Sequence, residues 1–278
     1  RSGDGETCAR CSTPATPGRS EGSGRPASDR DVIGWENLAS APACEGGRPL
    51  SLHRRGDEYV IRAGGVALMS SRQSGSEVAL ARLARRALEA DPATEGGLSA
   101  RRCDATAQDG ARRVLVGGLG MGFTAAAALE AFPDARIVVA EIEAHVVDWN
   151  RRWLAPLAGS PLDDPRLEVV VEDVHALVGS AAREPDGLRF DAILLDVDNG
   201  PEALSRRSNE RLYAPEGIAS AARALRSGGV LAIWSAGPDA SFGKRLARLG
   251  GELQTHRVSP RAGSRGRARH TIWLARPA

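Results

Sequence analysis

The residues best suited to chemistry are a glycine-rich turn and a carboxylate that follows it. The strand-like run Val114–Val116 leads into glycines at alternate positions, Gly118, Gly120 and Gly122. Glycine permits a sharp turn and leaves the main chain open to a ligand, because no Cβ stands in the way. Glu141 ends the next strand-like run, where a carboxylate can hold both hydroxyls of a ribose. The glycine pattern would also suit a plain strand–helix turn, and its spacing is not that of NAD or FAD sites.

Further carboxylates follow the next two strand-like runs. Asp173, followed by Val174, comes after one run, and Asp196 ends another, two residues before Asp198. Open α/β sheets bind ligands at the carboxyl ends of their strands, so these side chains should gather at one edge. Asp173 would also serve as a helix N-cap, because a helical pattern starts directly after it. We predict that Asp196 and Asp198 are catalytic.

The elements that must position these residues alternate between strand and helix. Alternation of this kind indicates parallel strands with right-handed crossovers in an open three-layer α/β sheet. Strand-like runs lie at 113–116, 137–141, 167–171, 191–196, 230–234, 253–258 and 270–275, and helical patterns at 124–132, 143–154, 174–182 and 215–225.

The part of the chain before this α/β region has a different character. Residues 1–47 are rich in Gly, Ser and Pro, and we expect them to be a mostly disordered tail. Short apolar runs within residues 48–75 predict a small antiparallel meander of two or three strands, and residues 76–110 a helix and a polar linker. The nucleoside-binding catalytic α/β domain should then cover residues 111–278.

Composition excludes several kinds of protein. The 278 residues carry 37 basic and 35 acidic side chains, a net charge of +2 that gives no argument for a dedicated nucleic-acid or membrane binder. Lys244 is the one lysine and is followed by Arg245, so the Gly-Lys-Ser/Thr of a P-loop is absent and Schiff-base chemistry is disfavoured. Cys8 and Cys11 have no second ligand pair nearby, so we predict no metal site.

Two other groups of residues have a structural and a functional interpretation. The basic stretch 257–270 could contact RNA or phosphate, but no aromatic residues interleave for base stacking, which favours a solvated hairpin loop. Trp149 and Trp153 lie one helical turn apart and could stack on adenine, and core packing is favoured. We find neither a signal peptide nor a membrane-spanning run and expect a cytoplasmic protein.

From residue 48 to about 240 the chain resembles the class I S-adenosylmethionine-binding fold and, within it, the spermidine synthase (polyamine aminopropyltransferase) group. The segments that carry the resemblance are 114–124, 139–143, 164–169, 191–198 and 224–231, preceded by the meander and helix. The resemblance implies a Rossmann-like, seven-stranded, mostly parallel sheet with its last strand antiparallel and a small N-terminal β-meander subdomain. It also implies a homo-oligomer, a dimer or tetramer.

The resemblance implies roles for the site residues. Glu141 would hold the ribose and Asp173 with Val174 the adenine of a sulfonium nucleoside. Asp196 would be the base for an attacking amine. The co-substrate would be S-adenosylmethionine or its decarboxylated form, and the acceptor a small molecule, such as a polyamine.

Three departures from the family pattern concern the acceptor side of the site. Met121 stands where the family has an Asp that faces the aminopropyl ammonium of the co-substrate. Residues 75–77 read Gly-Ser-Glu instead of Tyr-His-Glu, and the loop 196–201 is shortened. The leading hypothesis is therefore a transferase of an aminopropyl or methyl group to an amine. The alternatives are a methyltransferase on RNA, protein or a metabolite, and a non-catalytic protein that binds the nucleoside.

Overall fold

The computed structural model describes most of the chain outside the N-terminal tail. The described residues are 34–42, 47–90, 111–185, 189–198, 200–201, 209–261 and 269–278. Cys8 and Cys11 lie outside these residues.

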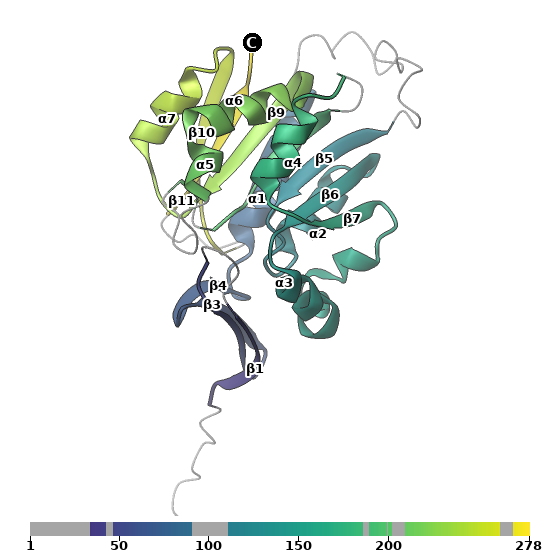
Figure 1. The fold of residues 1–278 in the computed structure, drawn as a ribbon, viewed down its shortest axis with the longest axis vertical. Coiled ribbons are helices and arrows are strands. Elements are labelled where there is room, and N and C mark those ends of the chain that lie inside the picture. The colour runs from purple at the N-terminus through teal and green to yellow at the C-terminus, as the bar shows by residue number, and fades with distance from the viewer. Residues whose placement is uncertain are drawn as a thin grey trace, which may run out of the picture. The chain divides into compact units, whose positions relative to one another are not determined.

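The predicted site residues lie at or just after the carboxyl ends of strands in the larger of the two described sheets. Within the described part of the chain this sheet has seven strands in the order β10-β11-β9-β8-β5-β6-β7 (Figure 1). Five neighbouring strands, from β9 to β7, are parallel, and the last strand, β11, runs antiparallel to both of its neighbours. The strands are β5 (Arg112–Gly117), β6 (Ala135–Glu141), β7 (Leu167–Val171), β8 (Phe190–Leu195), β9 (Leu225–Ser235), β10 (Glu252–Val258) and β11 (His270–Arg276). The predicted fold class is confirmed.

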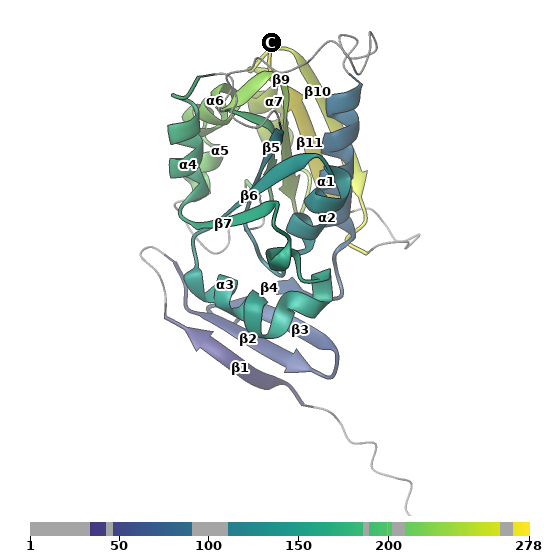
Figure 2. The same ribbon diagram turned by 90° about the vertical axis from the view of Figure 1, so that its right-hand side faces the viewer.

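Helices cover both faces of this sheet, so the domain has three layers (Figure 2). One apolar cluster joins α1 and α2 to one face, and a second joins α4, α5, α6 and α7 to the other. The strands between them, such as β5, are buried on both sides, which explains their continuous apolar runs. The helices are α1 (Gly75–Glu89), α2 (Phe123–Ala131), α3 (Ala144–Trp149), α4 (Val174–Ala181), α5 (Asn209–Tyr213), α6 (Pro215–Arg223) and α7 (Ala240–Ala247).

The second sheet is an antiparallel meander that precedes α1. In the described residues it has four strands in chain order, β1 (Glu36–Ala41), β2 (Leu50–Arg55), β3 (Glu58–Ala63) and β4 (Val66–Ser70). The predicted start at residue 48 is corrected, because β1 lies earlier, inside the expected tail. Half of its residues are exposed and few of its side chains are large and apolar, so backbone pairing with β2 defines it rather than an apolar pattern.

The helices α5 and α7 and a change of helix type after α3 were not predicted. Both helices are short, of five and eight residues, so each offers little periodicity to detect. The predicted helix 143–154 is α3 followed by a π-helical turn at Asn150–Leu154. No described helix has the length and apolar character needed to cross a membrane.

Candidate active site

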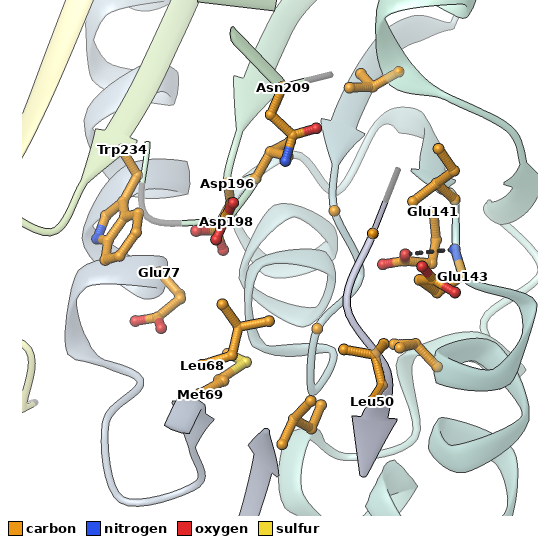
Figure 3. Close-up of a pocket in the computed structure, with 18 of the residues that line it drawn as sticks. Leu50, Leu68, Met69, Glu77, Glu141, Glu143, Asp196, Asp198, Asn209 and Trp234 are labelled. Carbon is orange, nitrogen blue, oxygen red and sulfur yellow. Dashed lines mark hydrogen bonds between the residues drawn. The ribbon is translucent and has the colours of Figure 1, made fainter. Parts of the chain in front are cut away.

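A pocket opens at the carboxyl edge of the parallel strands, beside the meander. Its volume is about 340 Å³. Its walls come from β2–β4, the ends of β6 and β9, the start of β11, the loops that follow β5 and β8, and α1, α3, α4 and α5. Figure 3 shows Glu141 and Glu143 on one side of it and Glu77, Asp196 and Asp198 on the other. We call the side of Glu141, where the sequence analysis predicts the nucleoside, the nucleoside side, and the side of Glu77, Asp196 and Asp198 the acid side.

The carboxylate of Glu141 accepts hydrogen bonds from backbone amides, and Glu141 also lines the pocket. Its two carboxylate oxygens accept hydrogen bonds from the N–H groups of Leu119 and Glu143, both at 2.9 Å. Burial raises the pKa of this carboxyl, while the backbone donors act in the opposite direction. Each carboxylate oxygen has a second lone pair, so Glu141 can orient the glycine turn and still accept from two ribose hydroxyls.

The three predicted glycines have different roles. Gly118 and Gly120 line the pocket, whereas Gly122 is not among the described lining residues. Gly118 has φ +90°, and a Cβ there would collide with the carbonyl oxygen of Asp196. Gly122 has φ +82° and begins α2 packed against Asn150 and Pro161. The first two glycines shape the pocket floor, and Gly122 permits the turn into the helix.

Asp173 and Val174 lie at the nucleoside side, at the start of α4. Both line the pocket. Asp173 is the N-cap of α4, because its Oδ1 accepts a hydrogen bond from the N–H of His175 at 2.9 Å. The N-cap role uses one oxygen and leaves acceptor capacity for a ligand, so the two interpretations of Asp173 are compatible.

Asp196 follows β8 and lies at the acid side. Its Oδ2 accepts a hydrogen bond of 2.5 Å from the hydroxyl of Thr124, in the first turn of α2. Burial raises the pKa of Asp196 to about 6, and the hydrogen bond from Thr124 partly opposes this rise. A carboxyl with this pKa can exchange a proton near neutral pH, as a general base must.

Glu77 is the main site residue that the sequence reasoning did not assign. It lies on the buried face of α1 with Leu80, Ala81 and Ala84, and it lines the pocket beside Asp196. Burial and then the negative charge of Asp196 raise the pKa of Glu77 to about 7. A carboxylate at an otherwise apolar helix position was a detectable signal, because burying an unpaired charge is costly.

Asp198 is held in an unusual conformation by its neighbours. It has φ +55°, in the left-handed region that Asp adopts more readily than most residues. The hydroxyl of buried Tyr213, on α5, donates to the carbonyl oxygen of Val197 at 3.2 Å and so anchors this loop. Asp198 lines the pocket with Asp196 and Glu77, so the loop delivers two carboxylates to the acid side.

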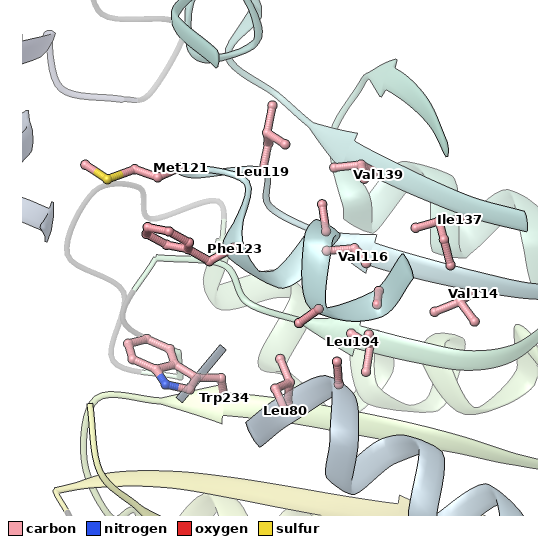
Figure 4. Packing of buried hydrophobic residues seen from close by; sticks show 14 of the residues in the cluster. Leu80, Val114, Val116, Leu119, Met121, Phe123, Ile137, Val139, Leu194 and Trp234 are labelled. Atoms are coloured by element: carbon pink, nitrogen blue, oxygen red, sulfur yellow. The ribbon is translucent and has the colours of Figure 1, made fainter. Parts of the chain in front are cut away.

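Met121 lies in the apolar core rather than in the pocket. Its side chain is fully buried, in one cluster with Phe123, Leu80 and Trp234 (Figure 4). It is absent from the described lining residues. The position where the resemblance implies a carboxylate toward the co-substrate thus packs the core.

Several other sequence candidates do not reach the pocket. Trp149 is buried in the apolar core, and Trp153 packs against it. Residues 262–268 of the basic stretch 257–270 lie outside the described residues, and its last member, His270, lines the pocket. Within the described ranges, no three His, Cys, Asp or Glu side chains are grouped to hold a metal ion.

Comparisons of the sequence with known proteins agree with the suspected resemblance. Residues 104–238 match the family model described as spermine/spermidine synthase domain. The polyamine aminopropyltransferase of Mycobacterium tuberculosis is 37% identical over 131 residues, which are 47% of this chain and 24% of the relative. Polyamine aminopropyltransferase 1 of Hyperthermus butylicus is 32% identical over 146 residues, 52% of this chain and 47% of the relative. The chain thus spans between about a quarter and a half of the length of these relatives.

The fold has solved counterparts over most of its length. The spermidine synthase structure from Thermotoga maritima matches with a TM-score of 0.62 and 15% identity, covering 86% of this chain and 72% of that one. At this identity the match establishes the fold, and the matched family domain covers the glycine turn and the loop of Asp196.

Proposed function

Because residues 104–238 match the family model described as spermine/spermidine synthase domain, we propose that this chain transfers an aminopropyl group from decarboxylated S-adenosylmethionine to an amine. The observation that carries the proposal is the pairing, in one pocket, of a nucleoside side with a cluster of three carboxylates, Glu77, Asp196 and Asp198. A cationic sulfonium and a cationic acceptor both favour such a site, because carboxylates stabilise positive charge.

The residues on the nucleoside side fit the adenosine part of such a co-substrate. Glu141 offers acceptor capacity to ribose hydroxyls, and Asp173 to an exocyclic amine. Gly118 and Gly120 leave the floor without side chains, so the 5′ end of a nucleoside can lie against the main chain.

The reaction is an in-line displacement at the carbon bound to the sulfonium. The amine nitrogen forms the new bond to this carbon, the carbon–sulfur bond breaks, and its electron pair stays on sulfur as a neutral thioether. The amine attacks only after losing a proton, and Asp196 is the base that receives it. Alignment of the two reactants can lower the activation barrier by about 7–11 kcal/mol. A general base typically raises the rate ~10²–10⁴-fold, which corresponds to about 3–5 kcal/mol. Positioning should therefore dominate the rate.

A second candidate, methyl transfer from S-adenosylmethionine itself, is favoured by Met121. Its thioether is buried in the core and carries no charge with which to pair an ammonium. If the chain transfers a methyl group, the carboxylate of S-adenosylmethionine should improve binding. If it transfers an aminopropyl group, the same carboxylate should weaken binding, because the acid cluster repels it.

Calorimetric titration of S-adenosylmethionine, its decarboxylated form and methylthioadenosine distinguishes the two candidates. Tighter binding of the decarboxylated form, with formation of an aminopropylated product from putrescine, is the expected result. Tighter binding of S-adenosylmethionine, with methylated products, would replace the first candidate by the second. Binding without turnover on any amine would contradict the first candidate.

A further inference from the structure

Behind the acid cluster lies a hydrogen-bonded chain of three side chains that the proposed reaction has not yet used. His270 Nδ1 lies 2.9 Å from Ser76 Oγ, and the Ser76 hydroxyl lies 2.8 Å from Glu77 Oε2, to which it donates. Ser76 is fully buried, while Glu77 and His270 both line the pocket. His270 is only partly buried. The chain thus connects the acid cluster to an imidazole that reaches solvent.

We propose that this chain is a proton path, which takes the proton that the acceptor amine loses at Asp196 through Glu77 and Ser76 to His270 and then to water. The inference rests on the proposed transfer to an amine. It assigns Ser76 and His270 to the reaction and gives Glu77 a second role beside the attraction of a cationic acceptor.

The reaction creates the need for such a path. An alkylamine has a pKa of about 10.4, like a lysine side chain, so the acceptor enters as an ammonium ion. One proton must leave it before the nitrogen can attack. A proton that stayed on Asp196 or Glu77 would block the next turnover, because Asp196 could not accept another.

The three side chains can pass a proton without moving. When Glu77 is ionised, the Ser76 hydroxyl donates to it and accepts from His270 Nδ1–H. When Glu77 is protonated, it donates to Ser76, which donates to an unprotonated Nδ1 of His270. One proton passes from Glu77 to Ser76 while the Ser76 proton passes to Nδ1 of His270. The imidazolium then loses its Nε2 proton to water, and both hydrogen bonds have reversed direction. The second arrangement becomes the first, and one proton has reached water.

The electrostatics of the path suit this exchange. Glu77 has a pKa raised to about 7 and Asp196 a pKa raised to about 6, both mainly by burial. Burial, and then the charge of Arg269, lowers the pKa of His270, so the imidazole is neutral at neutral pH and able to accept a proton. Asp196 and Asp198 face the path from the loop after β8, and Arg269 precedes β11. The side chains lining the pocket there from β4 and β9, Leu68, Met69 and Trp234, carry no charge.

Packing also holds the imidazole in place. The ring of Trp234, on β9, meets the ring of His270 edge to face, with centroids 4.9 Å apart and planes at 87°. The neighbouring residue Thr271 pairs with Ser235 in the β9–β11 register. The sheet therefore presents His270 to α1 at a defined position, although the two residues lie almost two hundred positions apart in the chain.

The first test is chemical rescue of His270→Ala. We expect steady-state, multiple-turnover aminopropylation of putrescine to slow about tenfold or more, at the lower end of the effect of acid–base groups. The affinity for decarboxylated S-adenosylmethionine, measured by calorimetry, should stay unchanged. Imidazole added to the buffer should restore the rate in proportion to its free-base form. His256→Ala on the neighbouring strand β10 is the matched control, because His256 is half-buried but does not line the pocket.

The second test separates a path from mere packing. Ser76→Ala removes the central hydroxyl, and it should slow the reaction as His270→Ala does, but without rescue by imidazole. Equal rates in wild type and Ser76→Ala, or a failure of imidazole to accelerate His270→Ala, would overturn the proton path.

A third measurement does not depend on turnover. Nitrogen NMR of the His270 ring in the ligand-free protein should show the proton on Nδ1 above the pKa of Glu77, and Ser76→Ala should return it to Nε2. A proton on Nε2 in the wild type at high pH would contradict the path. If putrescine is not aminopropylated at all, the proposed function fails for this acceptor, and the NMR result alone judges the hydrogen-bonded chain.

Discussion

Replacing Glu77 by glutamine should stabilise the folded protein at high pH and leave it unchanged at low pH. The carboxyl of Glu77 has a pKa of about 7 in the folded protein, against an ordinary value of 4.5, because burial and the charge of Asp196 oppose its ionisation. Glutamine has nearly the same shape and keeps an oxygen that accepts from Ser76, but it carries no charge. The substitution therefore isolates the cost of ionising this position.

The sign follows from proton binding. Between these two pKa values the folded protein holds a proton that the unfolded chain has released, so folding is favoured most below about pH 4.5. This contribution is lost as the pH rises through the folded-state pKa. The pKa of Glu77 rises from 4.5 in the unfolded chain to about 7 in the folded protein. At about 1.4 kcal/mol per pH unit, ionising Glu77 lowers the free energy of unfolding by about 3 kcal/mol. For a domain of this size, removing this cost is a rise of about 6–12 °C in Tm at alkaline pH.

Urea unfolding followed by tryptophan fluorescence measures the difference directly. We expect Glu77→Gln to exceed the wild type by about 3 kcal/mol near pH 8.5 and to match it within about 0.5 kcal/mol near pH 4.5. Glu216→Gln makes the same change of charge at an exposed position in α6 and should show no such dependence on pH. An equal gain at both pH values, or no gain near pH 8.5, would refute the reasoning that Glu77 is ionised at a cost.

Three substitutions test the remaining site residues. Asp196→Asn should lower the single-turnover rate about 10²–10⁴-fold while the Kd of the nucleoside, from calorimetry, changes little, and equal losses of rate and affinity would argue against a base. Thr124→Val removes the hydrogen bond that lowers the pKa of Asp196, so the acidic limb of the pH–rate profile should move to higher pH, and an unmoved limb would assign that limb to another group. Glu141→Gln should weaken nucleoside binding about tenfold or more, because a charged acceptor is lost, and unchanged affinity in calorimetry would remove the ribose contact.

The nucleoside side of the pocket could be read from the sequence because local order places it. The carboxyl end of a parallel strand and the turn that follows it are consecutive residues, so the positions of Gly118, Glu141 and Asp173 can be predicted from the apolar runs that precede them. The parallel arrangement then brings these ends to one edge. The β1 strand escaped detection for the opposite reason, since its pairing with β2 rather than its own side chains defines it.

Asp196 and Asp198 on the acid side follow an apolar run too, but their neighbours there could not be predicted in the same way. Glu77 reaches Asp196 because α1 packs across β8 and β9, and His270 reaches Ser76 because β11 inserts beside β9. Met121 stands inside the glycine turn, where the resemblance implies a residue that faces the co-substrate, yet its side chain is buried in the apolar cluster. These contacts depend on which helix faces pack on which strands, and the spacing of residues along the chain does not determine this packing.

The sequence by itself determined the fold class, the glycine turn and the carboxylates at the strand ends, since each depends on patterns within a few residues of one another. The tertiary structure decided which carboxylates share a pocket, which glycines face it and which histidine is linked to Glu77 through Ser76. Burial and contact between distant segments set the pKa of Glu77 and the neighbours of His270. Both arise only when helix and sheet pack and exclude water.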